Sequence, residues 1–345
     1  MKILFVINSL KCKSGMERVA VLLANLFQEK LNYEIVIVNR DTSDSDVAFP
    51  LLDKVKVIKA DGNIISFYNK IRNIINIEEP DRIIIHNMGK LSMLCSILPK
   101  KNIELLSIEH VSFVSRNLYL KVLSKLFYAL IDKVVVLTKN DLKNYSGKKV
   151  FKISNISPYP ISSRVYSINS KKIIAVGRLD YQKNFGDLIL AWNKIPKDVI
   201  SEWTLEIWGD GDEYDNLLYL INKLDIKNIH LKGTSNNMED IYLSSSFLVM
   251  SSIFEGLPMV LIEAQSFGLP IISFDCPYGP SEVVTHDKDG FLISLGDVDG
   301  LSLAIKELIL DRDKRISFSI NARKSAIRYS QEHILSKWKN LLENK

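Results

Sequence analysis

The sequence predicts an α/β protein built from two doubly wound parallel sheets. Apolar runs of strand length alternate with helix-like segments, first over ILFVI (3–7), EIVIV (34–38), DRIIIH (81–86), ELLSIEH (104–110) and KVVVLT (133–138). After a polar, irregular stretch the alternation starts again with IIAVG (173–177), TLEIWG (204–209), IHLKG (229–233), FLVMSS (247–252) and PIISF (270–274). Strands that alternate with helices are typical of parallel sheets covered by helices. The restart predicts a second domain of the same kind.

The length agrees with two domains, because 345 residues suit two of roughly 170 residues each. We place the boundary near residue 167, which gives Rossmann-like domains at 1–167 and 168–325. A helical pattern covers about 317–343, and we assign residues 326–345 to a C-terminal helix. The apolar positions of this pattern are Ile320, Ile327, Ile334, Leu335, Trp338 and Leu342.

Composition points to a globular protein of a reducing compartment. Cys12, Cys95 and Cys276 are odd in number and widely spaced, so they predict neither a disulfide framework nor a metal cluster. The start MKILFVINSL is short and lacks a small-residue cleavage site, so it is better interpreted as the first strand. No uninterrupted apolar run approaches the roughly 18 residues of a membrane span. We therefore expect a cytoplasmic protein that does not cross a bilayer.

Two acids, Glu255 and Glu263, are separated by seven intervening residues in FEGLPMVLIEAQSFGLPII. Glu255 falls in the loop after a predicted strand, Pro258 suits the first turn of the next helix, and Glu263 lies further along that helix. A diphosphate would fit the helix start, and the two carboxylates can accept hydrogen bonds from sugar and ribose hydroxyls. The amides that can point at the anion belong to Gly256, Leu257, Met259 and Val260. The alternative is a capping acid and an ordinary helix-surface glutamate.

Two glycine-containing segments follow predicted strands of the second domain. VGRLDYQKN (176–184) delivers Arg178 and Lys183, which can neutralise a diphosphate or form a solvated surface turn. IWGDGDE (207–213) places Gly209 and Gly211 after a strand, where glycine permits close approach of a ligand or a tight turn. Their spacing is not that of a dinucleotide fingerprint, which argues against an NAD enzyme.

The first domain offers two candidates. Gly15 in SGMERV (14–19) lies in a loop before an amphipathic helix, where free amides can meet an anion or a sugar. His110 ends a predicted strand and faces the cleft that two such domains are expected to enclose, although a lone histidine is usually structural. His86 also ends a strand, and we assign it no role.

Taken in this order, SGMERV, EH (109–110), VGRLDYQKN, IWGDGDE and the Glu-seven-Glu segment resemble the retaining glycosyltransferases of family 4, with the GT-B fold. The resemblance implies that Arg178 and Lys183 contact the donor phosphates and that His110 approaches the donor sugar. It also implies an acceptor-binding N-terminal domain, a nucleotide-sugar-binding C-terminal domain and a tail that crosses back to the former. Family members often have two adjacent glycines where this chain has Ser14-Gly15.

The expected reaction is transfer of a hexosyl unit, with retention, from a nucleotide sugar to an acceptor hydroxyl. UDP is favoured over GDP on family frequency alone, and the expected acceptor is a lipid-linked saccharide. The segment FDCPYGPSEVVTHDKDGFLI (274–293) is similar to stretches in bacterial surface-polysaccharide members of the family, which implies capsule, O-antigen or related oligosaccharide synthesis. The alternative for this segment is a structural connection. We expect no metal, no covalent nucleophile and a same-face displacement. The expected catalytic residues are Glu255, Arg178, Lys183 and His110. The expected donor-binding residues are Glu263, Gly15, Gly209, Gly256, Leu257, Met259 and Val260.

Charge is divided unevenly between the two halves. Residues 1–170 hold 25 Lys and Arg against 15 Asp and Glu, a net +10, which leaves −5 for the remainder of the stated +5. Within the basic half, RNLYLKVLSKLFYALIDK (116–133) can form a helix with Asn117, Lys121, Ser124 and Lys125 on its polar stripe. It can rest on an anionic membrane as a peripheral contact or be a half-buried helix with a solvated face. Dispersed lysines without a recognition motif argue against nucleic acid.

Two other functions stay open at this stage. A UDP-sugar 2-epimerase shares the two-domain architecture but needs no acceptor. A non-catalytic sugar-binding subunit of a polysaccharide assembly complex would bind without turnover. Retention of both glutamates, Arg178 and Lys183 argues against the second alternative.

Overall fold

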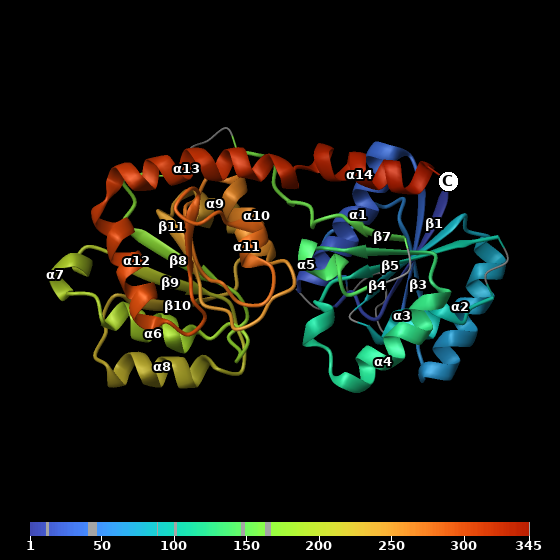
Figure 1. Ribbon diagram of the computed structural model, residues 1–345, viewed down its shortest axis with the longest axis horizontal. Helices are drawn as coiled ribbons and strands as arrows, with labels where there is room; N and C mark the ends of the chain where they lie inside the picture. The colour runs from blue at the N-terminus through green and yellow to red at the C-terminus, as the bar shows by residue number, and fades with distance from the viewer. Residues whose placement is uncertain are drawn as a thin grey trace. The chain divides into compact units, whose positions relative to one another are not determined.

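A computed structural model describes residues 1–11, 14–40, 47–87, 89–99, 102–145, 149–162 and 167–344 (Figure 1). It confirms an α/β protein with two parallel sheets, one of seven strands and one of six. The chain divides into two compact units: unit 1 comprises residues 1–156 and 332–345, and unit 2 comprises 157–331. The boundary near residue 167 and the binding roles of the two domains stay predictions. Cys12 lies outside the described residues.

The sheet of unit 1 has the order β3-β2-β1-β4-β5-β6-β7, with every pair parallel. Its strands are β1 (Lys2–Ile7), β2 (Glu34–Asn39), β3 (Lys56–Lys59), β4 (Arg82–Asn87), β5 (Glu104–Glu109), β6 (Lys133–Val136) and β7 (Lys149–Lys152). Its α-helices are α1 (Gly15–Leu31), α2 (Ile64–Glu78), α3 (Lys90–Ser96), α4 (Leu118–Phe127), α5 (Lys139–Leu142) and α14 (Gln331–Glu343). Helices α1 and α14 lie on one face of this sheet, whereas α2, α3 and α4 lie on the other (Figure 1).

The sheet of unit 2 has the order β10-β9-β8-β11-β12-β13, again with every pair parallel. Its strands are β8 (Lys172–Val176), β9 (Thr204–Trp208), β10 (Ile229–Gly233), β11 (Phe247–Met250), β12 (Ile271–Phe274) and β13 (Gly290–Ile293). Its α-helices are α6 (Phe185–Asn193), α7 (Lys197–Ile200), α8 (Tyr214–Lys223), α9 (Met238–Leu243), α10 (Met259–Ser266), α11 (Pro280–Val283), α12 (Val298–Leu310) and α13 (Arg312–Ala326). A core of strand side chains and residues of α6, α8 and α12 covers one face of this sheet.

Each sheet has one place where the strand order reverses. In unit 1 the chain runs outward from β1 to β3 and then returns to place β4 beside β1. In unit 2 it runs outward from β8 to β10 and returns to place β11 beside β8. Ligands of open α/β sheets bind beyond the carboxyl ends of the strands at such a switch point. The loops after β1, β4, β8 and β11 are therefore where a site is expected.

Helix α14 contacts the sheet side of α1 in unit 1. The ring of Trp338 meets that of Phe27 edge to face at 5.8 Å between centroids. Near the end of the helix, the Arg82 guanidinium donates to the carbonyl of Leu342 at 2.7 Å and Lys133 Nζ donates to that of Leu341 at 2.9 Å. These cations satisfy carbonyls that have no partner within the helix.

The helical pattern predicted over 317–343 is interrupted in the structure. Helix α13 ends at Ala326, a single 3-10 turn follows at Ile327–Tyr329, and α14 begins at Gln331. Ile320 and Ile327 are exposed, whereas the apolar residues of α14 are buried. The predicted helical pattern is therefore divided between two helices, and of its predicted apolar positions only those of α14 are buried.

The predicted helix over 116–133 is shorter than expected and is oriented differently. Helix α4 begins after Asn117, whose side chain accepts a hydrogen bond from the amide of Leu120 at 2.9 Å. Ser124, which we expected on the polar stripe, is buried and accepts a hydrogen bond from Arg116 at 3.1 Å. The side chains turned to solvent instead include large apolar ones. These are Leu118, Tyr119, Val122 and Leu126.

Among the described residues, no helix has the length and apolar character needed to span a bilayer.

Gly209 and Gly211 allow two backbone segments of unit 2 to touch. At Gly209, whose φ is +149°, an added Cβ would lie 1.8 Å from the carbonyl oxygen of Gly177. At Gly211, whose φ is +156°, an added Cβ would lie 2.4 Å from the carbonyl oxygen of Leu179. The amide of Leu179 also donates to the carbonyl of Asp210 at 3.0 Å. The loop after β9 therefore packs directly against the loop after β8.

We predict that Gly209→Ala destabilises unit 2 by about 2 kcal/mol or more, because the methyl group overlaps a backbone atom that cannot rotate away. The matched control is Gly186→Ala, since nothing lies within 4 Å of an added Cβ at Gly186. Urea denaturation followed by tryptophan fluorescence measures the difference. Equal midpoints for the two variants would contradict the backbone packing described here.

His86 is a buried titratable group in the core of unit 1. Its side chain is 0% exposed, and its ring centroid lies 4.8 Å from that of Phe5. Burial, with a smaller contribution from His110, lowers the pKa of His86 well below its ordinary value. The folded unit therefore holds a neutral imidazole.

This burial predicts a loss of stability in mild acid. The unfolded chain binds a proton at His86 as the pH falls through about 6.5, whereas the folded unit does not, so protonation favours unfolding. We expect the free energy of unfolding to fall between about pH 7.5 and about pH 5, and to fall less in His86→Phe. Denaturant titrations of both proteins at the two pH values measure this. An identical loss in the variant would show that His86 is not the source.

Candidate functional site at the carboxyl ends of the strands

The loops after β8 and β11 are bonded to each other at the switch point of unit 2. Ile253 donates its amide to the carbonyl of Gln182 at 2.9 Å, and the side chain of Gln182 donates to the carbonyl of Phe254 at 2.9 Å. Ser251 Oγ donates to the carbonyl of Lys183 at 2.9 Å. These bonds fix the backbone on which Lys183 and Glu255 are carried.

Lys183 and Glu255 form an ion pair between the two loops, with Nζ 2.6 Å from Oε1. Only 16% of the Lys183 side chain and 9% of the Glu255 side chain are exposed. The lysine stem runs along Gly177, where an added Cβ would lie 2.9 Å from Lys183 Cε. Because Gly177 has no side chain, it leaves room for Lys183. Charges held this far from water act more strongly on a ligand than exposed ones.

Arg178 stands apart from this pair. Its side chain is exposed and pairs with Asp180 Oδ2 at 3.1 Å. The other oxygen of Asp180 accepts a hydrogen bond from the amide of Lys183 at 3.1 Å. Asp180 therefore connects the two cations that we expect to contact phosphate. Sequence reasoning missed this aspartate. Its position at the start of the turn in RLDYQKN is a signal for this role, because aspartate commonly bonds to backbone amides in turns.

Glu263 lies inside α10 and is only 2% exposed. The hydroxyl of Tyr242 donates to its Oε2 at 2.8 Å, and the Tyr242 ring stacks on Phe267 at 5.3 Å between centroids. The alternative of an ordinary helix-surface glutamate is therefore wrong. Tyr242 is a partner that the sequence did not reveal, because it comes from α9.

The N-terminus of α10 carries no side-chain cap. Pro258 is the N-cap residue, one position before the expected first turn, and Met259 is the first helical residue. Leu257 and Met259 are buried, whereas Gly256 and Val260 are partly exposed. The backbone amides at a helix start without a side-chain cap suit an anion.

The segment 274–293 supports the loop that carries Glu255. Tyr278 donates its amide to the carbonyl of Glu255 at 3.3 Å, and the amide of Glu255 donates to the carbonyl of Pro277 at 3.4 Å. At Gly279, whose φ is +108°, an added Cβ would lie 2.4 Å from the carbonyl oxygen of Gly256. This segment thus holds the backbone of Glu255 and Gly256 from one side.

In unit 1, two candidates and one additional histidine lie at carboxyl ends of strands. Gly15 is exposed and is the first residue of α1 rather than part of the preceding loop, because Ser14 is the N-cap and its carbonyl accepts from Arg18. His110 follows β5 directly, and its Nε2 lies 3.2 Å from Nδ1 of His86. Burial lowers the pKa of His110 to about 4.

The residue before His110 is anchored by a buried ion pair. Glu109 pairs with Arg116 and accepts a hydrogen bond from the hydroxyl of Tyr128 at 2.6 Å. The Arg116 guanidinium lies 5.6 Å from the centroid of the Tyr128 ring. A buried carboxylate with these partners fixes the point at which the chain leaves β5.

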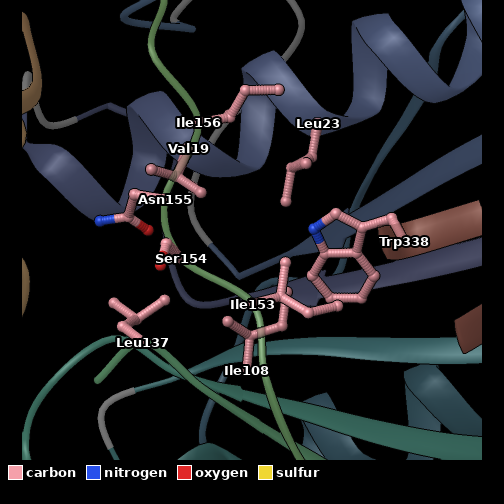
Figure 2. Close-up of a pocket in the computed structure, with 9 residues that line it drawn as sticks. All are labelled: Val19, Leu23, Ile108, Leu137, Ile153, Ser154, Asn155, Ile156 and Trp338. Carbon is pink, nitrogen blue, oxygen red and sulfur yellow. The ribbon is translucent and has the colours of Figure 1, made fainter. Parts of the chain in front are cut away.

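A small pocket of unit 1 lies beside this strand end. Figure 2 shows Val19 and Leu23 of α1, Ile108 of β5 and Trp338 of α14 among the side chains around it. Ser154 and Asn155 supply its polar side chains. Its lining is mainly apolar, so we place no charged ligand there.

The two cysteines among the described residues, Cys95 and Cys276, are free and buried. Burial raises the pKa of each thiol to about 12, so neither is poised as a nucleophile. In the described part of the chain, no three His, Cys, Asp or Glu side chains gather in a way that could hold a metal ion.

Comparison with known proteins shows sequence similarity to one family. Residues 163–325 match the family described as Glycosyl transferases group 1. The chain is 33% identical over 358 residues to the amylovoran biosynthesis glycosyltransferase AmsD of Erwinia amylovora, with 99% of each chain covered. It is 26% identical over 360 residues to a Campylobacter jejuni alpha-1,4-N-acetyl-D-galactosaminyltransferase, covering 99% of this chain and 98% of the relative.

Solved structures show the same fold at lower sequence identity. Anabaena HepE in complex with UDP-glucose matches 100% of both chains with a TM-score of 0.83 and 17% identity. S. aureus TarM, in a complex that contains UDP, matches 100% of both chains with a TM-score of 0.81 and 16% identity. The identity shared with AmsD over nearly the full length of both chains places this protein, an enzyme, among the group 1 glycosyltransferases, family 4, with the GT-B fold.

Proposed function

We propose that this glycosyltransferase moves a hexosyl unit from a UDP-sugar to an acceptor hydroxyl, with retention of anomeric configuration. The acceptor is a lipid-linked saccharide used in the synthesis of a bacterial surface polysaccharide, such as a capsule, exopolysaccharide or lipopolysaccharide. The single observation that carries the donor half of the proposal is the Lys183–Glu255 pair beside the uncapped start of α10. The names of the relatives support the acceptor half: AmsD belongs to amylovoran biosynthesis, and the Campylobacter jejuni enzyme is named for a PP-undecaprenol saccharide.

The diphosphate of the donor lies against the start of α10 in this proposal. Its oxygens are held by Lys183, Arg178 and the amides of Gly256, Leu257, Met259 and Val260. Preorganised donors of this kind stabilise the charge that develops in a transition state. The lysine ammonium has three N–H donors, so it can keep its bond to Glu255 while it binds a phosphate oxygen. Gly209 contributes because its missing side chain lets the loop after β9 pack against the loop after β8.

The sugar and the ribose are held by carboxylates in this proposal. Glu255 accepts hydrogen bonds from hydroxyls of the donor sugar, and Glu263 accepts from the ribose while Tyr242 keeps its other oxygen occupied. On the family resemblance, Gly15 and His110 are proposed as further donor contacts. None of these groups needs to form a covalent bond to the sugar.

The transfer step is a same-face displacement. The acceptor oxygen forms a bond to the anomeric carbon as the bond from that carbon to the diphosphate oxygen breaks. The acceptor proton passes to the leaving diphosphate, whose growing charge Lys183 and Arg178 stabilise. A trapped glycosyl-enzyme intermediate would contradict this step.

We predict that Lys183→Ala and Glu255→Gln each lower kcat/KM by roughly a hundredfold, the usual effect of removing one preorganised charge or donor. The assay is release of nucleoside diphosphate from a panel of UDP-, GDP- and ADP-sugars, with and without EDTA. The matched controls are Lys171→Ala and Glu202→Gln, because these residues form an exposed ion pair elsewhere in unit 2. We expect both controls to retain wild-type activity.

The same assay separates the alternatives. Release of a converted sugar without any acceptor would indicate the 2-epimerase, and absence of both turnover and donor binding would indicate the non-catalytic subunit. Turnover of a UDP-sugar that survives Lys183→Ala and Glu255→Gln unchanged would refute the site while leaving the reaction in place.

We also propose that α4 lays its apolar face on an anionic phospholipid surface at the inner face of the cytoplasmic membrane. Leu118, Val122 and Leu126 repeat every four residues and are exposed, with Tyr119 next to them. Lys125 is exposed beside them, and the first 170 residues carry the net charge of +10. Apolar side chains next to basic ones are the composition of an interfacial helix.

The triple variant Leu118→Ser, Val122→Ser, Leu126→Ser is expected to weaken binding to phosphatidylglycerol vesicles by at least about tenfold, measured by co-sedimentation. The control is Ile64→Ser, Ile65→Ser, which removes exposed apolar side chains from α2. Added salt should weaken the wild-type interaction. Equal binding of the two variants, or equal binding to neutral and anionic vesicles, would exclude α4 as the contact.

A further inference from the structure

His86 is a buried histidine to which the proposed reaction gives no task. It is the last but one residue of the strand β4, beside the switch point of unit 1, and is 0% exposed. Its ring stacks on that of His110, with centroids 5.4 Å apart and an interplanar angle of 19°. Its Nδ1 faces Nε2 of His110 at 3.2 Å, which is hydrogen-bond distance. His110 is thus held by a second imidazole.

One proton lies between Nδ1 of His86 and Nε2 of His110. Which of these two nitrogens carries it can be inferred from the surroundings of the other nitrogen of His86, Nε2. Nε2 of His86 is buried and has no hydrogen-bond partner among the described residues. If His110 donated to His86, the neutral His86 ring would carry its own proton on Nε2, as a buried donor without an acceptor. If His86 donates through Nδ1–H, Nε2 is left as a bare lone pair. Buried N–H groups without a partner are rarer in proteins than acceptors without one, so the second arrangement is favoured.

We propose that His86 is a positioning residue which donates from Nδ1 to Nε2 of His110 and thereby fixes His110 as the tautomer protonated at Nδ1. The inference rests on the proposed function, in which His110 contacts the donor sugar. Which ring nitrogen carries a proton is set by the bond that the other nitrogen makes. With Nε2 occupied as an acceptor, His110 presents an N–H donor at Nδ1, for which no described residue provides an acceptor.

This arrangement gives His110 one chemical role and excludes another. A neutral Nδ1–H group donates a hydrogen bond to an oxygen of the ligand, such as a sugar hydroxyl, and helps to orient it. It cannot remove a proton, because its only lone pair faces His86. Burial lowers the pKa of both rings, which agrees with two neutral imidazoles sharing a single proton between them. His110 therefore orients the donor, and the acceptor proton goes to the leaving diphosphate.

The direct test is the tautomer of His110 in the full-length protein. Long-range proton–nitrogen NMR spectra of protein labelled with 15N-histidine distinguish the two neutral tautomers, and His110→Asn and His86→Asn identify the signals. We expect His110 to be protonated at Nδ1. A wild-type His110 protonated at Nε2 would overturn the proposal.

Two variants of His86 separate the hydrogen bond from the packing of the ring. His86→Phe keeps a ring and removes the donor, so His110 should lose its fixed tautomer. In His86→Asn an amide nitrogen is bonded to Cγ, as Nδ1 is in histidine. This variant can therefore restore the donor and keep His110 protonated at its own Nδ1. Identical His110 spectra in the two variants would overturn the proposal, and circular dichroism confirms that both are folded.

Kinetics supply the second readout. With the donor that the wild-type enzyme turns over, His86→Phe should lower kcat/KM roughly tenfold, the rate equivalent of one misplaced hydrogen bond, whereas His86→Asn should stay within about threefold. Equal losses in both variants would contradict a role through the proton. If no nucleotide sugar is turned over, the proposed function fails while the NMR result still decides the tautomer.

Discussion

The ion pair between Lys183 and Glu255 is the interaction on which the candidate donor site depends. It joins the loops after β8 and β11, the two strands at the switch point of unit 2. Its geometry requires Gly177 to lack a side chain, and Asp180 holds the amide of Lys183. Because two partly buried charges are costly unless they are well placed, this backbone support is what makes the pair favourable.

Both units hold their candidate side chains with a second layer of buried polar groups. Tyr242 bonds to Glu263, and His86 bonds to His110. Each supporting residue lies in a different element from the one it supports and removes one hydrogen-bonding option from its partner. A side chain whose orientation is fixed by such a hydrogen bond is oriented before the ligand arrives, which is the physical content of preorganisation.

Prediction of the fold from the sequence succeeded where burial on both faces of a sheet leaves an uninterrupted apolar run. The three strands that it did not predict, β3, β7 and β13, all lie at sheet edges, are four residues long and are partly exposed. An edge strand needs no continuous apolar run, so its pattern resembles that of a loop. The orientation of α4 could not be predicted either, because Ser124 turns inward only to meet Arg116.

The sequence by itself determined the fold class, the family, the positions of Lys183, Glu255 and His110 near strand or helix ends, and that of Glu263 within a helix. These depend on local periodicity and short motifs. Tertiary structure alone decided their partners. Glu255 bonds to a lysine 72 residues away, Glu263 to Tyr242 and His110 to a histidine 24 residues away. The physical reason is that in parallel sheets neighbouring strand ends come from segments separated by whole helices, so the contacts that tune each charge carry no local signal.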